Sequence, residues 1–132
     1  MSDESDVLKA NAAFYSAFAA GDFAAMAALW SETATVACIH PGGPPLAGRS
    51  IVMASWRDIL ASPHRPKIRH HADQAFLFGE AALVTCYEAL EGGFLVATNL
   101  FVREQGRWRM THHHAGPAPA PSRRERAAGT VH

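Results

Sequence analysis

The chain has 132 residues, of which 48 % are hydrophobic, and its 12 basic residues balance its 12 acidic ones. This length and composition fit one globular domain with a packed core. The balanced charge excludes the strongly basic surface that nucleic acid or an anionic membrane requires, and no apolar stretch approaches the roughly 20 residues of a membrane-spanning helix.

The beginning of the chain and its cysteines indicate a cytoplasmic location. Residues 1–6 are acidic and lack the basic and apolar regions of a signal peptide. The two cysteines, Cys38 and Cys86, form no Cys-X-X-Cys pattern, so we expect them to be small buried side chains rather than a disulfide.

The first half of the chain predicts three helices and one short strand. Apolar residues recur at helical spacing from Val7 to Phe18, with Ser5 or Asp6 as the cap and Gly21 at the end. Asp22 can cap a second helix that carries Trp30, and Ser50 can cap a third that carries Trp56. Between them, residues 33–39 are rich in β-branched side chains, and the loop at 40–45 contains prolines that end the strand.

From residue 67 onward the hydrophobic pattern changes to a period of two. It predicts strands at about 67–78, 81–91, 94–104 and 107–114, with two-residue turns at Gly92-Gly93 and Gln105-Gly106. Helices followed by an antiparallel meander indicate an α+β domain, in which a curved sheet wraps around the N-terminal helices and leaves a cavity. We expect this domain to span residues 1–116, followed by a mobile tail rich in Pro, Ala and Arg at 117–132.

The tight turns allow the register of the last three strands to be predicted. They place Asn99 opposite Cys86 and His112, and Ala97 opposite Glu88 and His114. Because side chains alternate along a strand, His112 and His114 should share the cavity face with Glu88 and Asn99, whereas His113 should point away.

The turn at Gly79-Glu80 leaves two registers open for the preceding strand. A two-residue loop would place Asp73 opposite Cys86, where its carboxylate could act as a base. A three-residue loop would place Gln74 there instead. We favour the longer loop because it keeps Phe76 and Phe78 inside the molecule.

This arrangement predicts a pocket for a small, mostly apolar metabolite, with Glu88, His112 and His114 as candidate catalytic residues. Glu88 would orient His114, and either histidine would move a proton on a bound carbonyl compound. The alternative is a polar cluster that satisfies itself in a non-catalytic binding or dimerisation module. The candidate substrate-binding residues are Tyr15, Trp30, His40, Trp56, Asn99, Phe101 and Met110.

A weaker alternative is a metal site. His112 and His114 are two residues apart and could both reach one zinc or iron ion, with Glu88 or His40 as a third ligand. Alternate histidines on a strand also serve packing, so we expect neither a metal nor any other cofactor.

Several segments together resemble the SnoaL-like branch of the nuclear transport factor 2-like (NTF2-like) superfamily. They are residues 10–15, 38–42, 48–49, 55–56 and 106–115. The resemblance implies a cone-shaped, cystatin-like α+β fold with a deep pocket, and a homodimer formed through the sheet. The superfamily includes ketosteroid isomerase, scytalone dehydratase and polyketide cyclases. Tyr15 lies on the first predicted helix, but neither the isomerase nor the dehydratase constellation is matched in full, so the resemblance specifies the fold rather than the activity.

Overall fold

The computed structural model describes residues 2–122. These residues form three helices, α1 (Asp3–Ala20), α2 (Phe23–Leu29) and α3 (Arg49–Ala61). The six strands of the same range are β1 (Ala37–Ile39), β2 (Pro45–Ala47), β3 (Arg69–Phe78), β4 (Ala81–Leu90), β5 (Gly93–Glu104) and β6 (Arg107–Ala118). No helix in this part of the chain is long and apolar enough to cross a membrane.

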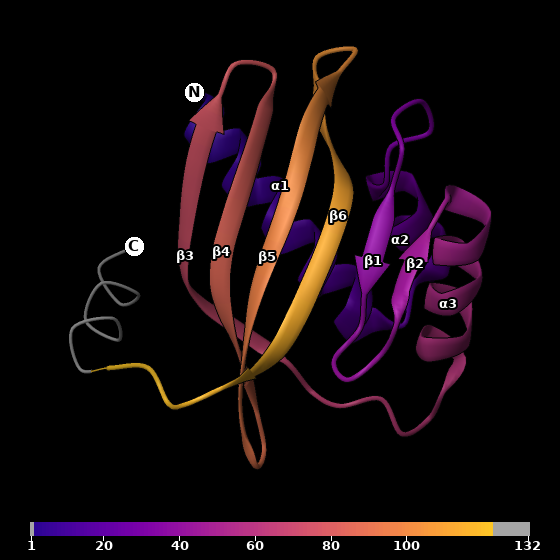
Figure 1. Cartoon of the computed structure of the whole chain (residues 1–132), viewed down its shortest axis with the longest axis vertical. Helices are drawn as coiled ribbons and strands as arrows, with labels where there is room; N and C mark the ends of the chain where they lie inside the picture. Colours follow the sequence, from indigo (N-terminus) through magenta and orange to yellow (C-terminus); the bar gives the residue numbers. More distant parts are fainter. Residues whose placement is uncertain (1, 123–132) are drawn as a thin grey trace.

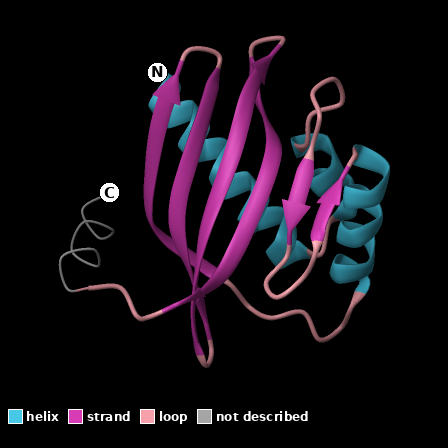
Figure 2. Cartoon of the chain, viewed as in Figure 1, coloured by secondary structure: helices cyan, strands magenta, loops and turns pink. Residues whose placement is uncertain are grey.

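The strands form one curved sheet in the order β2-β1-β6-β5-β4-β3. Strand β1 runs parallel to β6, and every other neighbouring pair is antiparallel. All three helices lie behind the sheet in the view of Figure 1, with α1 crossing the long strands obliquely and α2 and α3 beside β1 and β2. Figure 2 shows that none of the helices formed by residues 2–122 lies on the opposite face. This confirms the predicted α+β class and the curved sheet around the helices.

The helix ends follow the capping rules, although two caps differ from the prediction. Gly21 ends α1 in the left-handed conformation, with φ 65°, and the Asp22 side chain accepts a hydrogen bond from the backbone N–H of Ala25. Both were predicted. Helix α1, however, begins at a Ser2 cap, earlier than expected, and Gly48 rather than Ser50 precedes α3.

Strand boundaries differ from the prediction at two places. Strand β1 covers only Ala37–Ile39, and the chain turns back at once to form β2, which begins inside the predicted loop. Strand β6 continues to Ala118, and Pro121 is buried, so ordered structure extends beyond the expected boundary at residue 116. The rest of the predicted tail, from residue 123, lies outside the described residues.

The hairpin turns define which faces point inward. Gln105 and Gly106 both have positive φ, 52° and 77°, as the predicted two-residue turn requires. The turn between β4 and β5 is formed by Glu91 and Gly92, because Leu90 pairs with Gly93. The pairing of β4 with β5 is therefore shifted by two residues from the predicted one. Because side chains alternate along a strand with a period of two, the same side chains still face inward.

The favoured three-residue loop between β3 and β4 is wrong. Phe78 pairs directly with Ala81, so the turn has two residues, Gly79 and Glu80. Consequently Phe76 and Phe78 point outward and are 47 % and 53 % exposed.

Two β-bulges interrupt the regular alternation of side chains. In β6, Phe101 pairs with Met110 but Leu100 pairs with His112, which leaves Thr111 as an extra residue. In β3 the register shifts between His71 and Gln74, and Ala72 adopts a φ of 58°. Each bulge changes which side chains reach the inner face of the sheet.

The bulge in β6 overturns the predicted orientation of the three histidines. His113 faces inward and is only 4 % exposed. His112 and His114 lie on the outer face, where their rings are 6.3 Å apart and the Nδ1 of His112 is 3.1 Å from the carbonyl oxygen of Ala37.

The core lies between the inner face of the sheet and the helices. Its largest fully buried apolar side chains are Phe14, Met26, Trp30, Phe101 and Met110. Burying one such side chain is worth about 1.5–3 kcal/mol, so these contacts hold the helices against the sheet.

Candidate functional site

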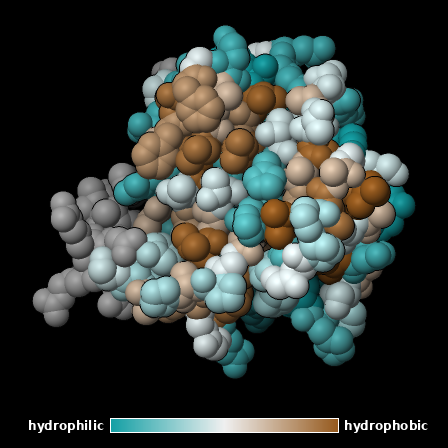
Figure 3. Space-filling view, viewed as in Figure 1, coloured by the Kyte–Doolittle hydropathy of each residue, from teal (hydrophilic) through white to brown (hydrophobic). Residues whose placement is uncertain are grey.

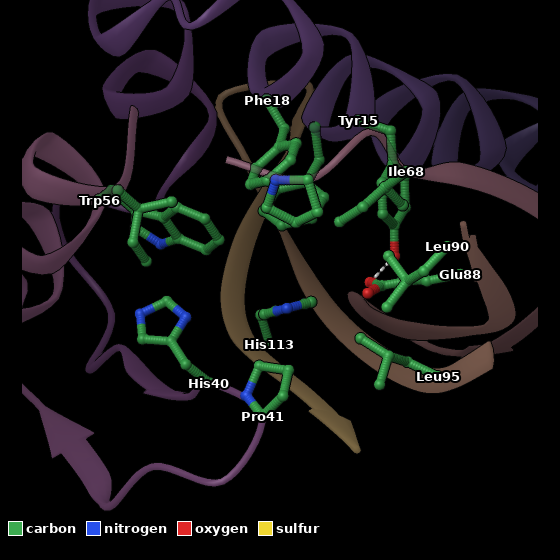
Figure 4. Close-up of a pocket in the computed structure, with 13 residues that line it drawn as sticks. Tyr15, Phe18, His40, Pro41, Trp56, Ile68, Glu88, Leu90, Leu95 and His113 are labelled. Atoms are coloured by element: carbon green, nitrogen blue, oxygen red, sulfur yellow. Dashed lines mark hydrogen bonds between the residues drawn. The ribbon is translucent and has the colours of Figure 1, made fainter. Parts of the chain in front are cut away.

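A cavity of about 340 Å³ opens between the helices and the inner face of the sheet. Helices α1 and α3 supply aromatic side chains, and the loop after β1 supplies His40 and Pro41 (Figure 4). The polar floor of the cavity consists of Tyr15 from α1, Glu88 from β4 and His113 from β6. The lining residues are Phe14, Tyr15, Phe18, His40, Pro41, Trp56, Ile59, Pro66, Ile68, Glu88, Leu90, Leu95 and His113. This combination of apolar walls with few polar groups is typical of a small-molecule site.

Glu88 and Tyr15 form the central polar contact of the cavity. The Tyr15 hydroxyl donates to Glu88 Oε2 over 2.6 Å, drawn as the dashed line in Figure 4. Burial raises the pKa of the Glu88 carboxyl, while the Tyr15 hydrogen bond and the nearby His70 oppose that rise. Burial also raises the pKa of the Tyr15 phenol, so the hydroxyl keeps its proton.

His113 is held in one tautomer by a chain of amide hydrogen bonds. The Asn99 amide nitrogen donates to Asn11 Oδ1 over 2.8 Å and contacts the Tyr15 oxygen at 3.3 Å. The Asn99 amide oxygen is therefore the acceptor for His113 Nδ1, 2.6 Å away, which places the imidazole proton on Nδ1 and leaves a lone pair on Nε2.

The His113 imidazole is uncharged at neutral pH. Burial, together with the smaller effect of the neighbouring imidazoles of His40, His112 and His114, lowers its pKa to about 3. His113 can therefore accept a hydrogen bond from a ligand through Nε2, but it is too weak a base to hold a proton.

The bulge in β3 brings a second polar group toward the same region. Asp73 Oδ2 accepts from the Asn11 amide at 3.1 Å and lies 2.7 Å from His70 Nδ1. The His70 ring stacks on Tyr15 at a centroid distance of 4.7 Å. Asp73, not Gln74, therefore joins the inner polar network, although it does not line the cavity itself.

His40 borders the cavity beside Trp56. Its Nε2 lies 3.0 Å from the hydroxyl oxygen of Ser55, and that hydroxyl donates to the Val52 carbonyl, so His40 Nε2 is the donor in the first contact. The imidazole meets the Trp56 ring edge to face at 4.8 Å, and burial lowers its pKa.

The buried cysteines are protonated side chains of the core. Burial raises the pKa of both Cys38 and Cys86 to about 12, and Cys86 Sγ lies 3.3 Å from the Tyr15 oxygen. Both thiols are free, as expected from the sequence.

The structure brings some of the predicted site residues together and separates others. Tyr15, His40, Trp56 and Glu88 line the cavity, and Asn99 lies directly behind His113 and Tyr15. Trp30, Phe101 and Met110 belong to the core instead and do not line the cavity.

The proposed pairing of His112 and His114 with Glu88 does not occur. The histidines are on the outer face and Glu88 is on the inner face, so these three side chains cannot act on one ligand or one metal ion. Among residues 2–122, no group of three or more His, Cys, Asp or Glu side chains is placed to hold a metal.

Prediction from the sequence left out Asn11, placed His113 on the wrong face, and named Asp73 only in the register that was not favoured. In the structure the buried residues of β6 are Trp108, Met110, His113 and Ala115, and the three-residue step between Met110 and His113 marks the bulge, but no feature of the sequence indicates that step. Asn11 is a polar residue in the middle of the apolar stripe of α1, which marks it as a buried hydrogen-bonding group.

Comparison with known proteins supports the fold. A model of the SnoaL-like domain matches residues 7–121. The F-box protein SKIP8 of Arabidopsis thaliana is 30 % identical over 111 residues, which are 83 % of this chain and 48 % of that protein. The chain therefore spans about half the length of this relative.

Two solved structures are similar over most of their length. One, from Streptomyces avermitilis, is described as "a putative dehydratase from the NTF2-like family"; it is 35 % identical, with a TM-score of 0.81 over 89 % of this chain and 97 % of that one. The other, from Thiobacillus denitrificans, is described as a "putative calcium/calmodulin-dependent protein kinase type II association domain". It is 34 % identical, with a TM-score of 0.71 over 83 % of this chain and 92 % of that one. The match over residues 7–121 and these structures together show that the chain belongs to the SnoaL-like domain family of NTF2-like proteins.

Proposed function

We propose that the chain binds a small ligand with an apolar body in this cavity, and that Glu88 exchanges a proton with the ligand's polar end. The observation that carries the proposal is the Tyr15–Glu88 hydrogen bond of 2.6 Å at the floor of an apolar cavity. Chemistry of this kind is that of an isomerase or a dehydratase.

The three polar groups of the floor would have separate roles. Glu88 is the acid–base group, because a carboxyl whose pKa is raised by burial titrates closer to neutral pH than an exposed one. Tyr15 orients the carboxyl. His113 Nε2 accepts a hydrogen bond from a ligand hydroxyl and stays neutral while doing so.

The similarity to the protein described as a dehydratase supports this proposal, as does the shared SnoaL-like fold. The aromatic rings of Phe14, Phe18 and Trp56 supply the contact area for an apolar ligand. If the cavity binds a ligand without exchanging a proton, the protein is a non-catalytic binding module. The experiment must distinguish this alternative from an enzyme.

The test is a metabolite screen by thermal shift, followed by calorimetry on each ligand found. Glu88→Gln keeps an acceptor for Tyr15 but removes the titratable carboxyl group, so we expect ligand affinity to fall by about tenfold, which corresponds to about 1.4 kcal/mol. Glu91→Gln is the matched control, because Glu91 lies exposed in the turn after β4.

Turnover separates an enzyme from a binding module. Ligands that the wild-type protein converts and Glu88→Gln binds but does not convert would establish catalysis. Equal affinity and no conversion in both proteins would remove Glu88 from the site and overturn the proposed proton exchange.

We also propose that the chain associates with itself through the outer face of the sheet. Phe76, Phe78 and Val96 are 47 %, 53 % and 42 % exposed on the outer face of β3 and β5, which none of the described helices covers. The similarity to the structure described as a kinase association domain supports an assembly role.

A further inference from the structure

We propose that the ligand of the cavity is cationic: a small amine with an apolar body, whose ammonium group lies against Glu88. This inference rests on the proposed ligand-binding function, and it further specifies that the ligand carries a positive charge.

Among residues 2–122, the side chains that line the cavity include a carboxyl group but no Lys or Arg. Its other ionisable groups are the phenol of Tyr15 and the imidazoles of His40 and His113. Burial lowers the pKa of both imidazoles, so neither supplies a positive charge at neutral pH. The lining can therefore be neutral or negative but not positive, and a carboxylate or phosphate ligand would find no counter-charge there.

Within the described part of the chain, Glu88 forms no ion pair. It is 2 % exposed, its hydrogen bond comes from Tyr15, and none of the ion pairs among the described residues includes it. Burying an unpaired carboxylate costs free energy, which a cation in the cavity would offset.

The other polar groups around Glu88 do not replace such a cation. Helix α1 presents Asn11 and Tyr15, β4 presents Cys86 and β6 presents His113, all of which are uncharged at neutral pH. On β3, His70 is the register partner of Glu88, but its Nδ1 is 2.7 Å from Asp73 Oδ2, so any positive charge on His70 is offset by that carboxylate.

Aromatic rings complete the environment that a cation favours. Phe14, Tyr15, Phe18 and Trp56 line the same cavity, and Phe14 and Phe18 meet Trp56 edge to face at centroid distances of 5.4 and 6.4 Å. Figure 4 shows the rings of Trp56 and Phe18 beside the space that Glu88 borders. The negative faces of such rings attract an ammonium group, and their area accommodates its apolar body.

The experiment compares three probes of nearly the same shape: 3-phenylpropylamine, 3-phenylpropan-1-ol and 3-phenylpropionate. Each is titrated into the full chain at pH 7.5, and binding is followed by the amide resonances of Phe14, Glu88 and His113. We expect the amine to bind at least about tenfold more tightly than the alcohol, and the propionate to bind least.

Two variants test whether Glu88 causes the preference. Glu88→Gln keeps the shape of the side chain without its charge, so amine and alcohol should bind this variant about equally. Glu91→Gln removes an exposed charge from the neighbouring turn and should leave the tenfold preference intact.

The outcomes distinguish this inference from the function on which it rests. Binding of the alcohol or the propionate at least as tightly as the amine would overturn the cationic ligand but leave the cavity as a ligand site. The same is true of an amine preference that persists in Glu88→Gln. If none of the probes moves the cavity resonances, both the inference and the proposed binding function are wrong.

Discussion

His113 shows how one buried side chain couples the stability of this protein to pH. Its pKa is about 3 in the folded chain, against an ordinary value of 6.5, because burial disfavours the imidazolium. Between these values the unfolded chain binds the proton and the folded chain does not. The stability that His113 confers is therefore complete above pH 6.5 and falls as the pH drops toward 3.

We predict that His113→Asn flattens the acid dependence of stability. The wild-type protein should lose up to about 1.4 kcal/mol per pH unit through His113 below pH 6.5, and the variant should not. Glu88 contributes with the opposite sign, because its raised pKa makes the folded chain bind the extra proton, but it does so in both proteins.

Urea unfolding at pH 7.5 and pH 5.5 measures the difference in slope. His64→Asn is the control, since this histidine lies exposed in the loop after α3 and is not among the groups that lower the His113 pKa. Identical slopes in wild type and His113→Asn would show that the imidazole is not buried as described.

At the scale of elements, the two bulges decide what the sheet presents to the cavity. The bulge in β3 allows His70 to stack on Tyr15 and Asp73 to accept a hydrogen bond from Asn11. It also requires Ala72 to adopt a φ of 58°. This left-handed conformation costs an alanine about 1–2 kcal/mol, whereas glycine adopts it freely.

We predict that Ala72→Gly stabilises the protein by up to about 1 kcal/mol, because relief of strain exceeds the extra entropy of the unfolded glycine. Ala75→Gly lies in the regular part of β3, opposite Val84. This variant should be destabilised, because glycine raises the conformational entropy of the unfolded chain and there is no strain at residue 75 to relieve. Urea midpoints of the two variants give the comparison. Equal losses would mean that the backbone at residue 72 is not strained.

The sequence predicted the turn at Gln105-Gly106 correctly, but it placed the turn between β4 and β5 one residue too late and favoured a loop between β3 and β4 that is one residue too long. It predicted neither bulge. The turn at Gln105-Gly106 was predictable because Gly106 adopts positive φ without strain, which is a local property of that residue. Thr111 carries no such signal. Thr111 becomes the extra residue because both neighbours of β6 fix the positions of the histidines that follow it. On one edge of β6, Leu100 of β5 pairs with His112; on the other edge, residues 37–39 of β1 pair with the three histidines. Those contacts join segments far apart in the chain.

At the scale of the whole molecule, the uncovered face of the sheet carries an exposed apolar patch. Figure 3 shows hydrophobic side chains gathered over the upper ends of β3 and β4, where Phe76 and Phe78 are about half exposed. Exposed apolar patches of this kind mark sites of association, and one face of a sheet commonly packs against another.

We predict that the double substitution Phe76→Lys and Phe78→Lys shifts the protein to a monomer, because burying two ammonium groups at the interface would be unfavourable. Sedimentation velocity at several concentrations measures the change. Ile51→Lys is the control, since Ile51 is 56 % exposed on α3, away from this face. A monomeric wild-type protein would contradict self-association outright.

The sequence by itself determined the class of fold, the order of the helices and long strands, and the inward orientation of Glu88 and Asn99. These follow from hydrophobic period, caps and turn residues, all of which act over a few positions. Tertiary structure alone decided that His113 rather than His112 and His114 faces the cavity, that Asp73 joins the polar network, and that Phe76 and Phe78 are exposed. The physical reason is that one extra residue in a strand reverses the faces of every side chain beyond it, and only pairing with distant strands decides where that residue is placed.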